Sequence, residues 1–120
     1  MQYMLLIYGA EDGWKSMSEE ERGQVFQAYV AFTKDLQDAG AMVAGDALDS
    51  TQTATTVRVK NDETLTTDGP FAETKEQLGG YYLIEADSLD EAIEWAARVP
   101  AARHGSVEVR PVMVFEEDGS

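Results

Sequence analysis

The sequence lacks cysteine, so it can form no disulfide and offers no thiol nucleophile, and this composition fits a reducing compartment. It has only one histidine, His104, which is too few for a His-rich transition-metal site. The motifs of a serine nucleophile elbow, a calcium-binding loop and a dinucleotide-binding loop are also missing. We therefore expect no metal and no cofactor.

Basic residues are scarce as well. The chain has 9 Lys and Arg residues against 23 Asp and Glu residues, which gives a net charge of -14. Such a surface repels phosphate groups, so we expect the protein to bind neither nucleic acid nor an anionic membrane surface. A basic protein partner stays open as an alternative, although acidity more often serves solubility.

Long apolar segments are missing too. The apolar run at residues 2–8 has the length of a strand rather than that of a membrane-spanning helix, and it lacks the basic region of a signal peptide. We therefore expect a cytoplasmic protein. A chain of 120 residues is short for two cores, so we expect a single domain over residues 1–115 and an acidic, solvated tail at residues 116–120.

Two capping boxes indicate where helices begin. Ser18 is followed three residues later by Glu21, and Ser88 in the same way by Glu91. The first helix should place an apolar face inward and end at a left-handed Gly40; that face consists of Val25, Tyr29, Phe32 and Leu36. The second should end before Pro100, and its inward residues are Leu89, Ala92, Ile93 and Ala96.

The remaining periodic segments predict strands. Core strands are expected at residues 2–8, 42–48, 81–86 and 106–115, and a hairpin at residues 53–60 and 63–67 around the turn Asn61-Asp62. The first strand is apolar almost throughout, so it should be central in its sheet. Pro111 cannot donate a hydrogen bond to a sheet, so the last strand should lie at an edge or carry a bulge.

Without the hairpin, the order strand, helix, strand, strand, helix, strand is that of the split β-α-β or ferredoxin-like fold. The predicted class is therefore α+β, a ferredoxin-like split βαβ sheet with an inserted β-hairpin. Both helices should cover one face of the sheet. We further expect the first and third core strands to be parallel neighbours in the centre, with the Pro111 strand outside.

The densest group of polar and turn-forming residues is the loop Asp68-Gly69-Pro70-Phe71-Ala72-Glu73-Thr74-Lys75-Glu76. Asp68-Gly69 can turn the chain, and Phe71 can bury the loop against the domain. The charges of Glu73, Lys75 and Glu76 either form an ion-pair cluster or present one cation between carboxylates to a small polar ligand. Asp68, Glu73 and Lys75 are thus our candidates for catalysis and for ligand binding.

Four further positions are informative. The pair Gly79-Gly80 predicts a bend or bulge entering the next strand. Tyr82 points to the opposite face from its neighbour Tyr81 and is a further ligand-binding candidate. Arg110 lies in an apolar strand, where it must pair with Glu85 or Glu108, extend to solvent or bind a ligand anion.

His104 is the only side chain with an unperturbed pKa near neutrality, which makes it a candidate for proton transfer. It follows Ala101-Ala102-Arg103 and precedes a glycine, as is typical of an exposed connection. We therefore expect it to be accessible to solvent and outside the main pocket, and we rank it below the loop candidates.

The unbroken stretch DGPFAETKE at residues 68–76, together with Val109-Arg110-Pro111-Val112, resembles the signature of DGPF-type members of the YCII-related family. The resemblance implies a ferredoxin-like sheet and a homodimer of the dimeric α/β-barrel type, associated through the open sheet faces. It also implies a setting linked to extracytoplasmic-function sigma factors, in signalling or stress response.

YCII-related proteins are also thought to use a His and Asp pair, the histidine from early in the chain and the aspartate before the last strand. No histidine precedes His104 here, and Arg98-Val99-Pro100 stands where the aspartate would be expected. The pair is missing.

These observations lead to two hypotheses on function. The first is a small dimeric domain that binds a small polar ligand or a protein partner, a basic one included. The alternative is a cofactor-free enzyme of the dimeric α/β-barrel type, with its pocket between the first helix and the sheet. That enzyme would transfer protons through Asp68, Glu73, Lys75 or His104.

Overall fold

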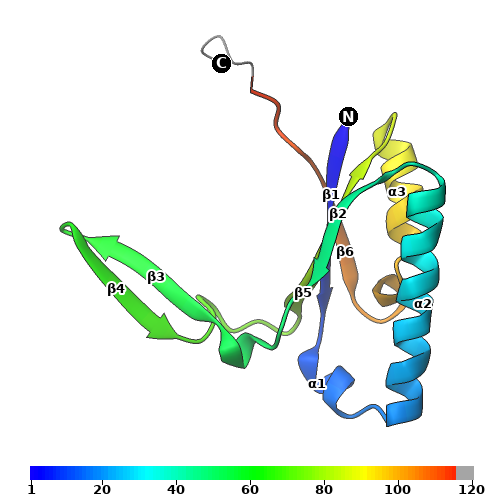
Figure 1. Cartoon of the computed structure of the whole chain (residues 1–120). Coiled ribbons are helices and arrows are strands. Elements are labelled where there is room, and N and C mark those ends of the chain that lie inside the picture. The colour runs from blue at the N-terminus through cyan, green and yellow to red at the C-terminus, as the bar shows by residue number, and fades with distance from the viewer. Residues whose placement is uncertain (116–120) are drawn as a thin grey trace.

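The computed structural model describes residues 1–115, so the expected acidic tail at 116–120 lies outside the described residues (Figure 1). The chain forms a mixed α and β structure. In chain order its elements are β1 (Gln2–Gly9), α1 (Glu11–Lys15), α2 (Glu19–Asp38), β2 (Met42–Ala47), the 3-10 turn η1 (Thr51–Thr53), β3 (Thr55–Lys60), β4 (Glu63–Asp68), β5 (Gln77–Glu85), α3 (Leu89–Arg98), the 3-10 turn η2 (Pro100–Arg103) and β6 (Ser106–Pro111).

Four strands form an antiparallel sheet in the order β2-β5-β1-β6, and α2 and α3 lie together on one of its faces (Figure 1). The central place of β1 and the edge place of β6 are as the sequence predicted. Pro111, the last residue of β6, lacks an N–H group, and the edge position requires none on the outer side. The other sheet face carries no helix in residues 1–115.

One prediction on topology is wrong. β1 and β5 are neighbours, but they run antiparallel, with Gln2 opposite Glu85 and Ile7 opposite Gly80. The right-handed crossover through α2 makes β2 parallel to β1 and leaves one strand's width between them. Because β5 returns after β2 in the reverse direction, it fills this gap antiparallel to both neighbours. The crossover rule therefore applies to β1 and β2 and not to β1 and β5.

The core lies between the sheet and the two long helices. β1 contributes every second residue to it, namely Tyr3, Leu5 and Ile7, as expected for a strand with one covered face. The other members are Phe32, Leu36, Ala41, Tyr82, Ile84, Ala86, Ala92, Ala96 and Val99. No charged residue within residues 1–115 is buried, so burial of apolar surface is what stabilises the packing of the helices on the sheet.

Helix α2 begins as predicted. The Ser18 hydroxyl accepts from the Glu21 N–H group at 3.1 Å, and the Glu21 carboxylate accepts from the Ser18 N–H group at 3.1 Å. These reciprocal bonds hold the pKa of Glu21 below its usual value. The helix ends at Asp38 with Ala39 as its C-cap, and Gly40 takes a left-handed conformation with φ 70°.

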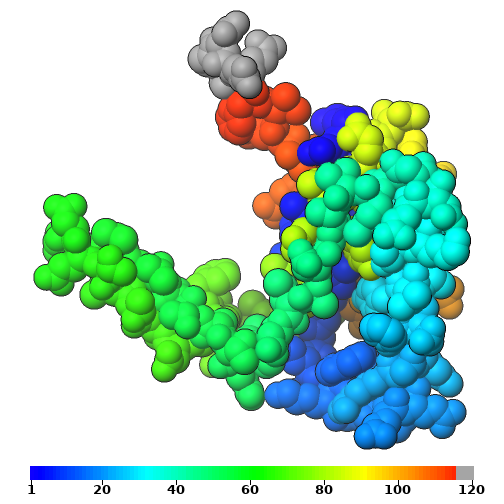
Figure 2. Space-filling view, in the orientation of Figure 1, coloured from blue at the N-terminus to red at the C-terminus, as the bar shows by residue number. Residues whose placement is uncertain are grey.

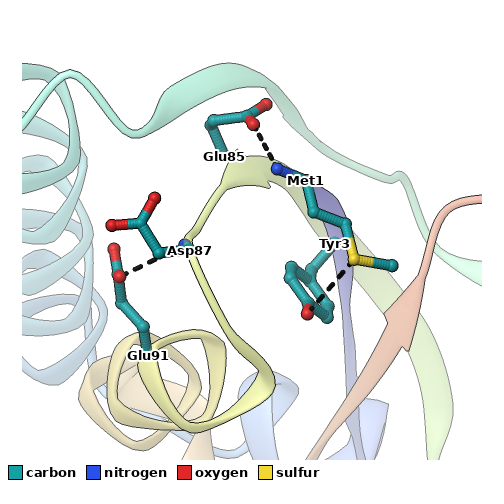
Figure 3. Close-up of polar contacts among 5 residues, drawn as sticks. All are labelled: Met1, Tyr3, Glu85, Asp87 and Glu91. Atoms are coloured by element: carbon teal, nitrogen blue, oxygen red, sulfur yellow. Dashed lines mark hydrogen bonds and ion pairs between the residues drawn. The ribbon is translucent and has the colours of Figure 1, made fainter.

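Helix α3 deviates in two ways from the expectation. The Ser88 hydroxyl caps it by accepting from the Glu91 N–H group at 3.2 Å, but the Glu91 carboxylate accepts from Asp87 instead of from Ser88 (Figure 3). Leu89 and Ile93 are each 49% exposed, because the small residues Ala92 and Ala96 are the ones that pack on the sheet. The inward orientation predicted for Leu89 and Ile93 is therefore wrong.

Polar contacts close the sheet where β1 begins and β5 ends. The Met1 amino group forms an ion pair with Glu85, and the Tyr3 hydroxyl donates to the Met1 Sδ at 3.5 Å (Figure 3). The Val112 N–H group donates to the Gln2 carbonyl at 3.0 Å, although β6 itself ends at Pro111 and not at the predicted residue 115. These contacts connect the start of β1 to the end of β5 and to the residue after β6.

Strands β3 and β4 form a two-stranded arm that extends away from the sheet on the side without helices (Figures 1 and 2). Its turn has φ values of 50° at Asn61 and 64° at Asp62, the type I′ pattern of two-residue hairpins. The arm enlarges the chain to a radius of gyration of 16.8 Å, compared with about 14 Å for a compact domain of this length. No helix in residues 1–115 is long and apolar enough to cross a membrane.

Candidate ligand pocket

A pocket of about 670 Å³ opens where α1 and the first half of α2 face the sheet, at the end opposite Met1. This volume lies within the range of small-molecule sites. Its walls are mostly apolar, and the aromatic side chains on this side of the sheet belong to Trp14, Phe26, Tyr29 and Tyr82. Tyr8 and Tyr81 also border the pocket, but alternation along β1 and β5 directs their side chains to the face without helices.

Glu11 ties together two walls of this pocket. Its carboxylate accepts from the Thr51 N–H group at 2.7 Å and from the Thr51 hydroxyl at 2.9 Å, and its N–H group donates to the Gln77 side chain at 3.0 Å. The bond from the Thr51 N–H group is the main cause that lowers the pKa of Glu11. One ionised residue of α1 thus fastens η1 and the start of β5 around the opening.

The inner wall is organised around Tyr82. Its hydroxyl shares a hydrogen bond with the Thr33 hydroxyl at 2.8 Å, and its ring meets Phe32 edge to face at 5.1 Å. β2 can pass this ring only because residue 45 is glycine, since a Cβ atom there would lie 2.7 Å from the Tyr82 Cδ1. The inner wall is therefore apolar, with a hydroxyl pair.

Two further tyrosines have raised pKa values. Burial raises the pKa of Tyr29 in the pocket, whereas on the sheet face without helices the hydrogen bond to the Asp46 carboxylate raises the pKa of Tyr81. That bond measures 2.7 Å. Hydroxyls with raised pKa values are neutral donors and acceptors at neutral pH and not general bases. The arrangement suits recognition of a ligand better than proton transfer.

The structure separates the candidate residues. Tyr82 lines the pocket, whereas Asp68, Glu73 and Lys75 are exposed and do not line it. No ion pair within residues 1–115 includes Glu73 or Lys75, and Glu76 instead accepts from the Ser106 hydroxyl at 2.9 Å. The charges of the loop form no ion-pair cluster there.

The expected burial of Phe71 is wrong, since this side chain is 80% exposed. Phe71 is not part of the buried cluster, and its loop connects the arm, which stands away from the sheet, to β5 (Figure 1). The loop begins as a turn, with Gly69 at φ 102° and its N–H group donating to the Ala54 carbonyl at 2.7 Å. Gly79 is the extra residue of a bulge between Ile7 and Tyr8 of β1, as the glycine pair predicted.

Arg110 and His104 both lie outside the pocket. The Arg110 guanidinium donates to Glu108 at 2.7 Å, one of the two partners considered. Both side chains of this pair belong to the sheet face that carries no helix, because Val107 and Val109 of the same strand pack against the core. His104 is exposed at the end of η2.

Sequence reasoning missed Trp14 and Phe26, as well as helix α1. Trp14 of α1 is 47% exposed. Phe26 of α2 is 63% exposed and lies outside the buried face of that helix. A signal for Phe26 exists: Phe26 and Val30 are large apolar residues one turn apart, outside the face that packs on the sheet. Such a second apolar row on a helix indicates a surface that meets something other than the core.

No group of three potential metal-binding side chains comes together within residues 1–115. The YCII-related domain family matches residues 1–116. An uncharacterized protein of Rhizobium meliloti (strain 1021) is similar over 118 residues, with 40% identity, covering 97% of this chain and 95% of the relative. The chain belongs to the YCII-related domain family.

Proposed function

We propose that this protein is a small-molecule binding domain whose ligand occupies the pocket between α1, α2 and the sheet. The pocket carries the proposal. It combines about 670 Å³ of space, mostly apolar walls and a few convergent hydroxyl groups, which are the usual properties of a ligand site. The bonds of Glu11 to Thr51 and of Thr33 to Tyr82 shape it before a ligand enters.

We further propose a homodimer, in a ferredoxin-like arrangement of the dimeric α/β-barrel type. The sheet face without helices carries Leu6 and Leu83, and the arm beside it exposes Val57 and Val59 at 58% and 66%. A single-layer sheet and a free hairpin are both marginal in water unless another surface covers them. A second copy of the chain provides that surface.

The resemblance to DGPF-type proteins supports a sigma-factor-linked setting for this domain, and the absence of cysteine supports a reducing, cytoplasmic compartment. The enzyme alternative has less support. Its candidates for proton transfer, Asp68, Glu73, Lys75 and His104, all lie outside the pocket, and the pocket itself presents Tyr29, whose pKa is raised.

A fragment screen tests the pocket. Small aromatic and aliphatic fragments should raise the melting temperature of the protein by mass action and shift the NMR signals of the Thr33 and Gly45 amides. The variant Val25→Trp, which fills the pocket from α2, should abolish both effects. Val57→Trp, the same change on the exposed arm, is the matched control and should leave them intact.

If Val25→Trp itself folds poorly, Phe26→Ala replaces it. Phe26 is 63% exposed, so its truncation should weaken fragment binding at nearly unchanged stability. Fragment signals that survive both changes, or that appear only on the arm, would refute the proposed site.

A further inference from the structure

We propose that the ligand of this pocket is an uncharged molecule with an apolar body and an oxygen that accepts hydrogen bonds, such as a ketone. This inference rests on the proposed function and names the class of ligand. The charges around the pocket are its first support. On the side of the helices, the charged side chains at the pocket are Glu11, Lys15 and Asp49. The nearby Asp46 carboxylate lies on the other sheet face, with its partner Tyr81.

These three charges stay at the opening of the pocket. The Glu11 carboxylate accepts from the hydroxyls of Ser50 and Thr51, and Lys15 and Asp49 are exposed. No charged side chain within residues 1–115 is buried. An ionised group of a ligand would therefore lose hydration at the inner wall without gaining a counter-charge, which is costly. An uncharged ligand avoids this cost.

The sheet contributes few side chains to the floor of the pocket. Gly45 lies opposite Tyr82 in the pairing of β2 with β5, and Gly80 precedes Tyr82 by two residues in β5. Both glycines therefore belong to the sheet face that the helices cover. Val25 and Phe26 of α2 line the same space. Backbone on one side and apolar side chains on the other suit the apolar body of a ligand.

The hydroxyl groups of the inner wall have hydrogens to donate. Thr33 and Tyr82 share one hydrogen bond at 2.8 Å, which uses one of their two hydroxyl hydrogens. Burial raises the pKa of Tyr29, and the Ala101 N–H group, which donates to the Tyr29 hydroxyl, lowers it in part. Tyr29 thus accepts with its oxygen and keeps its own hydrogen. A carbonyl oxygen has two lone pairs and can accept from both sources.

The position of the ligand follows from these features. Tyr82 lies near enough to Tyr29 to contribute to the rise of its pKa, so one ligand oxygen can approach both hydroxyls. The apolar body would then lie over Gly45 and extend toward Phe26 at the opening. Apolar contact should provide most of the affinity, and the hydroxyls should select the oxygen.

Three probes of similar size and different charge test the class of ligand at fixed ionic strength. They are the ketone acetophenone, the anion benzoate and the cation benzamidinium, titrated by calorimetry and by NMR. We expect acetophenone to bind roughly tenfold or more tightly than either ion, because each ion would give up hydration without a counter-charge. Val25→Trp should remove the binding of acetophenone. The comparison of probes uses the wild type and does not depend on how a variant folds.

A hydroxyl variant isolates the hydrogen bond. Tyr29→Phe should weaken acetophenone by about two- to tenfold, the usual contribution of one neutral hydrogen bond. It should leave ethylbenzene, which lacks the oxygen, unchanged. The carbonyl stretching frequency of bound acetophenone should be higher in this variant than in the wild type, since hydrogen bonds lower it. The matched control is Tyr3→Phe, which removes a hydroxyl at the Met1 end of the sheet and should alter neither result.

The outcomes separate the two proposals. If benzoate or benzamidinium binds as tightly as acetophenone, the uncharged class is wrong while a pocket blocked by Val25→Trp stands. If Tyr29→Phe changes neither the affinity for acetophenone nor its carbonyl frequency, the hydrogen bond from Tyr29 is refuted. If acetophenone fails to bind at millimolar concentration, the proposed class is overturned, and the fragment screen alone then decides on the pocket. Acetophenone binding that persists in Val25→Trp also overturns it.

Discussion

Two strand regions of the chain, β1 and β3, differ in what becomes of their apolar residues. In β1, alternate residues such as Leu5 and Ile7 are buried because α2 and α3 cover that face of the sheet. In β3, Val57 and Val59 alternate in the same way, yet they are 58% and 66% exposed because nothing in residues 1–115 covers the arm. Alternation therefore predicts a strand, but burial depends on whether a second layer exists.

A second contrast is that between the loop of residues 68–76 and the pocket. The loop DGPFAETKE follows the arm and contributes no side chain to the core, although it is the most distinctive stretch of the chain. The pocket, in contrast, is made of residues without any recognisable motif. The distinctive sequence and the candidate pocket lie in different parts of one chain, so the loop requires an explanation other than the stability of the monomer.

Core substitutions should give the largest difference between the two regions. Leu5→Ala or Ile84→Ala removes a completely buried side chain and should lower the free energy of unfolding by about 2–5 kcal/mol. In the monomer, at protein concentrations too low for the proposed dimer, Val59→Ala on the arm should change it by no more than about 0.5 kcal/mol. Urea denaturation, with slopes compared between variants, measures both. A loss for Val59→Ala as large as that for the core variants would show that the arm is covered in solution.

The elements predicted best from the sequence are those whose signals are local. The capping box at Ser18, the left-handed Gly40 and the missing N–H group of Pro111 each act within a few residues, and each is found as expected. The direction of β5 relative to β1 and the exposure of Phe71 depend on contacts between distant segments. No residue near Phe71 in the sequence tells whether a core lies within its reach.

The candidate site was harder to predict for the same reason. Tyr82 was identified because its strand alternates, but Trp14 and Phe26 become pocket residues only when α1 and α2 meet the sheet. The charged residues of the loop are close together in the sequence, which made them candidates. The sequence does not indicate how far they lie from the pocket.

Removal of the arm should have the second largest effect, on assembly and not on folding. Gly69 donates to the Ala54 carbonyl at 2.7 Å, so the two ends of the arm are adjacent and a Gly-Gly linker can replace residues 55–68. Light scattering should give twice the chain mass of 13.2 kDa for the wild type and a lower mass for the shortened chain. The shortened chain should keep its helical circular dichroism signal, because α2 and α3 pack on the four-stranded sheet and not on the arm.

Two results would contradict this prediction. A clean monomer in the wild type would refute the dimer and the barrel arrangement with it. A shortened chain that stays dimeric would show that the open sheet face alone is sufficient for association.

A smaller effect is expected at Glu11, which links the sheet half to the turn before the arm. Its pKa is lowered in the folded state, so its ionised form stabilises the fold above the unfolded pKa of about 4.3, and this contribution disappears as the pH falls through the lower folded value. Glu11→Gln should therefore lower the melting temperature slightly at neutral pH, and the difference from wild type should vanish in acid.

Glu21→Gln is the matched control, because the pKa of Glu21 is lowered as well but its bonds cap α2 outside the pocket. It should show the same direction of pH dependence without any change in fragment binding. Glu11→Gln should weaken that binding, since Glu11 fastens η1 to the pocket. Equal effects of both variants on fragment binding would contradict the role given to Glu11.

The smallest effects are expected at the loop of residues 68–76, and they test whether this loop takes part in ligand binding. Lys75→Ala and Asp68→Ala change exposed side chains outside the pocket, so we expect an unchanged melting temperature and unchanged affinity for fragments, measured by thermal shift and calorimetry. His104→Asn, in another exposed connection, should behave alike. If Lys75→Ala or Asp68→Ala abolished ligand binding at unchanged stability, the loop would have to reach a pocket that its own chain does not bring near it. In a dimer that pocket would belong to the second copy, and the separation between signature and site would then hold only within one chain.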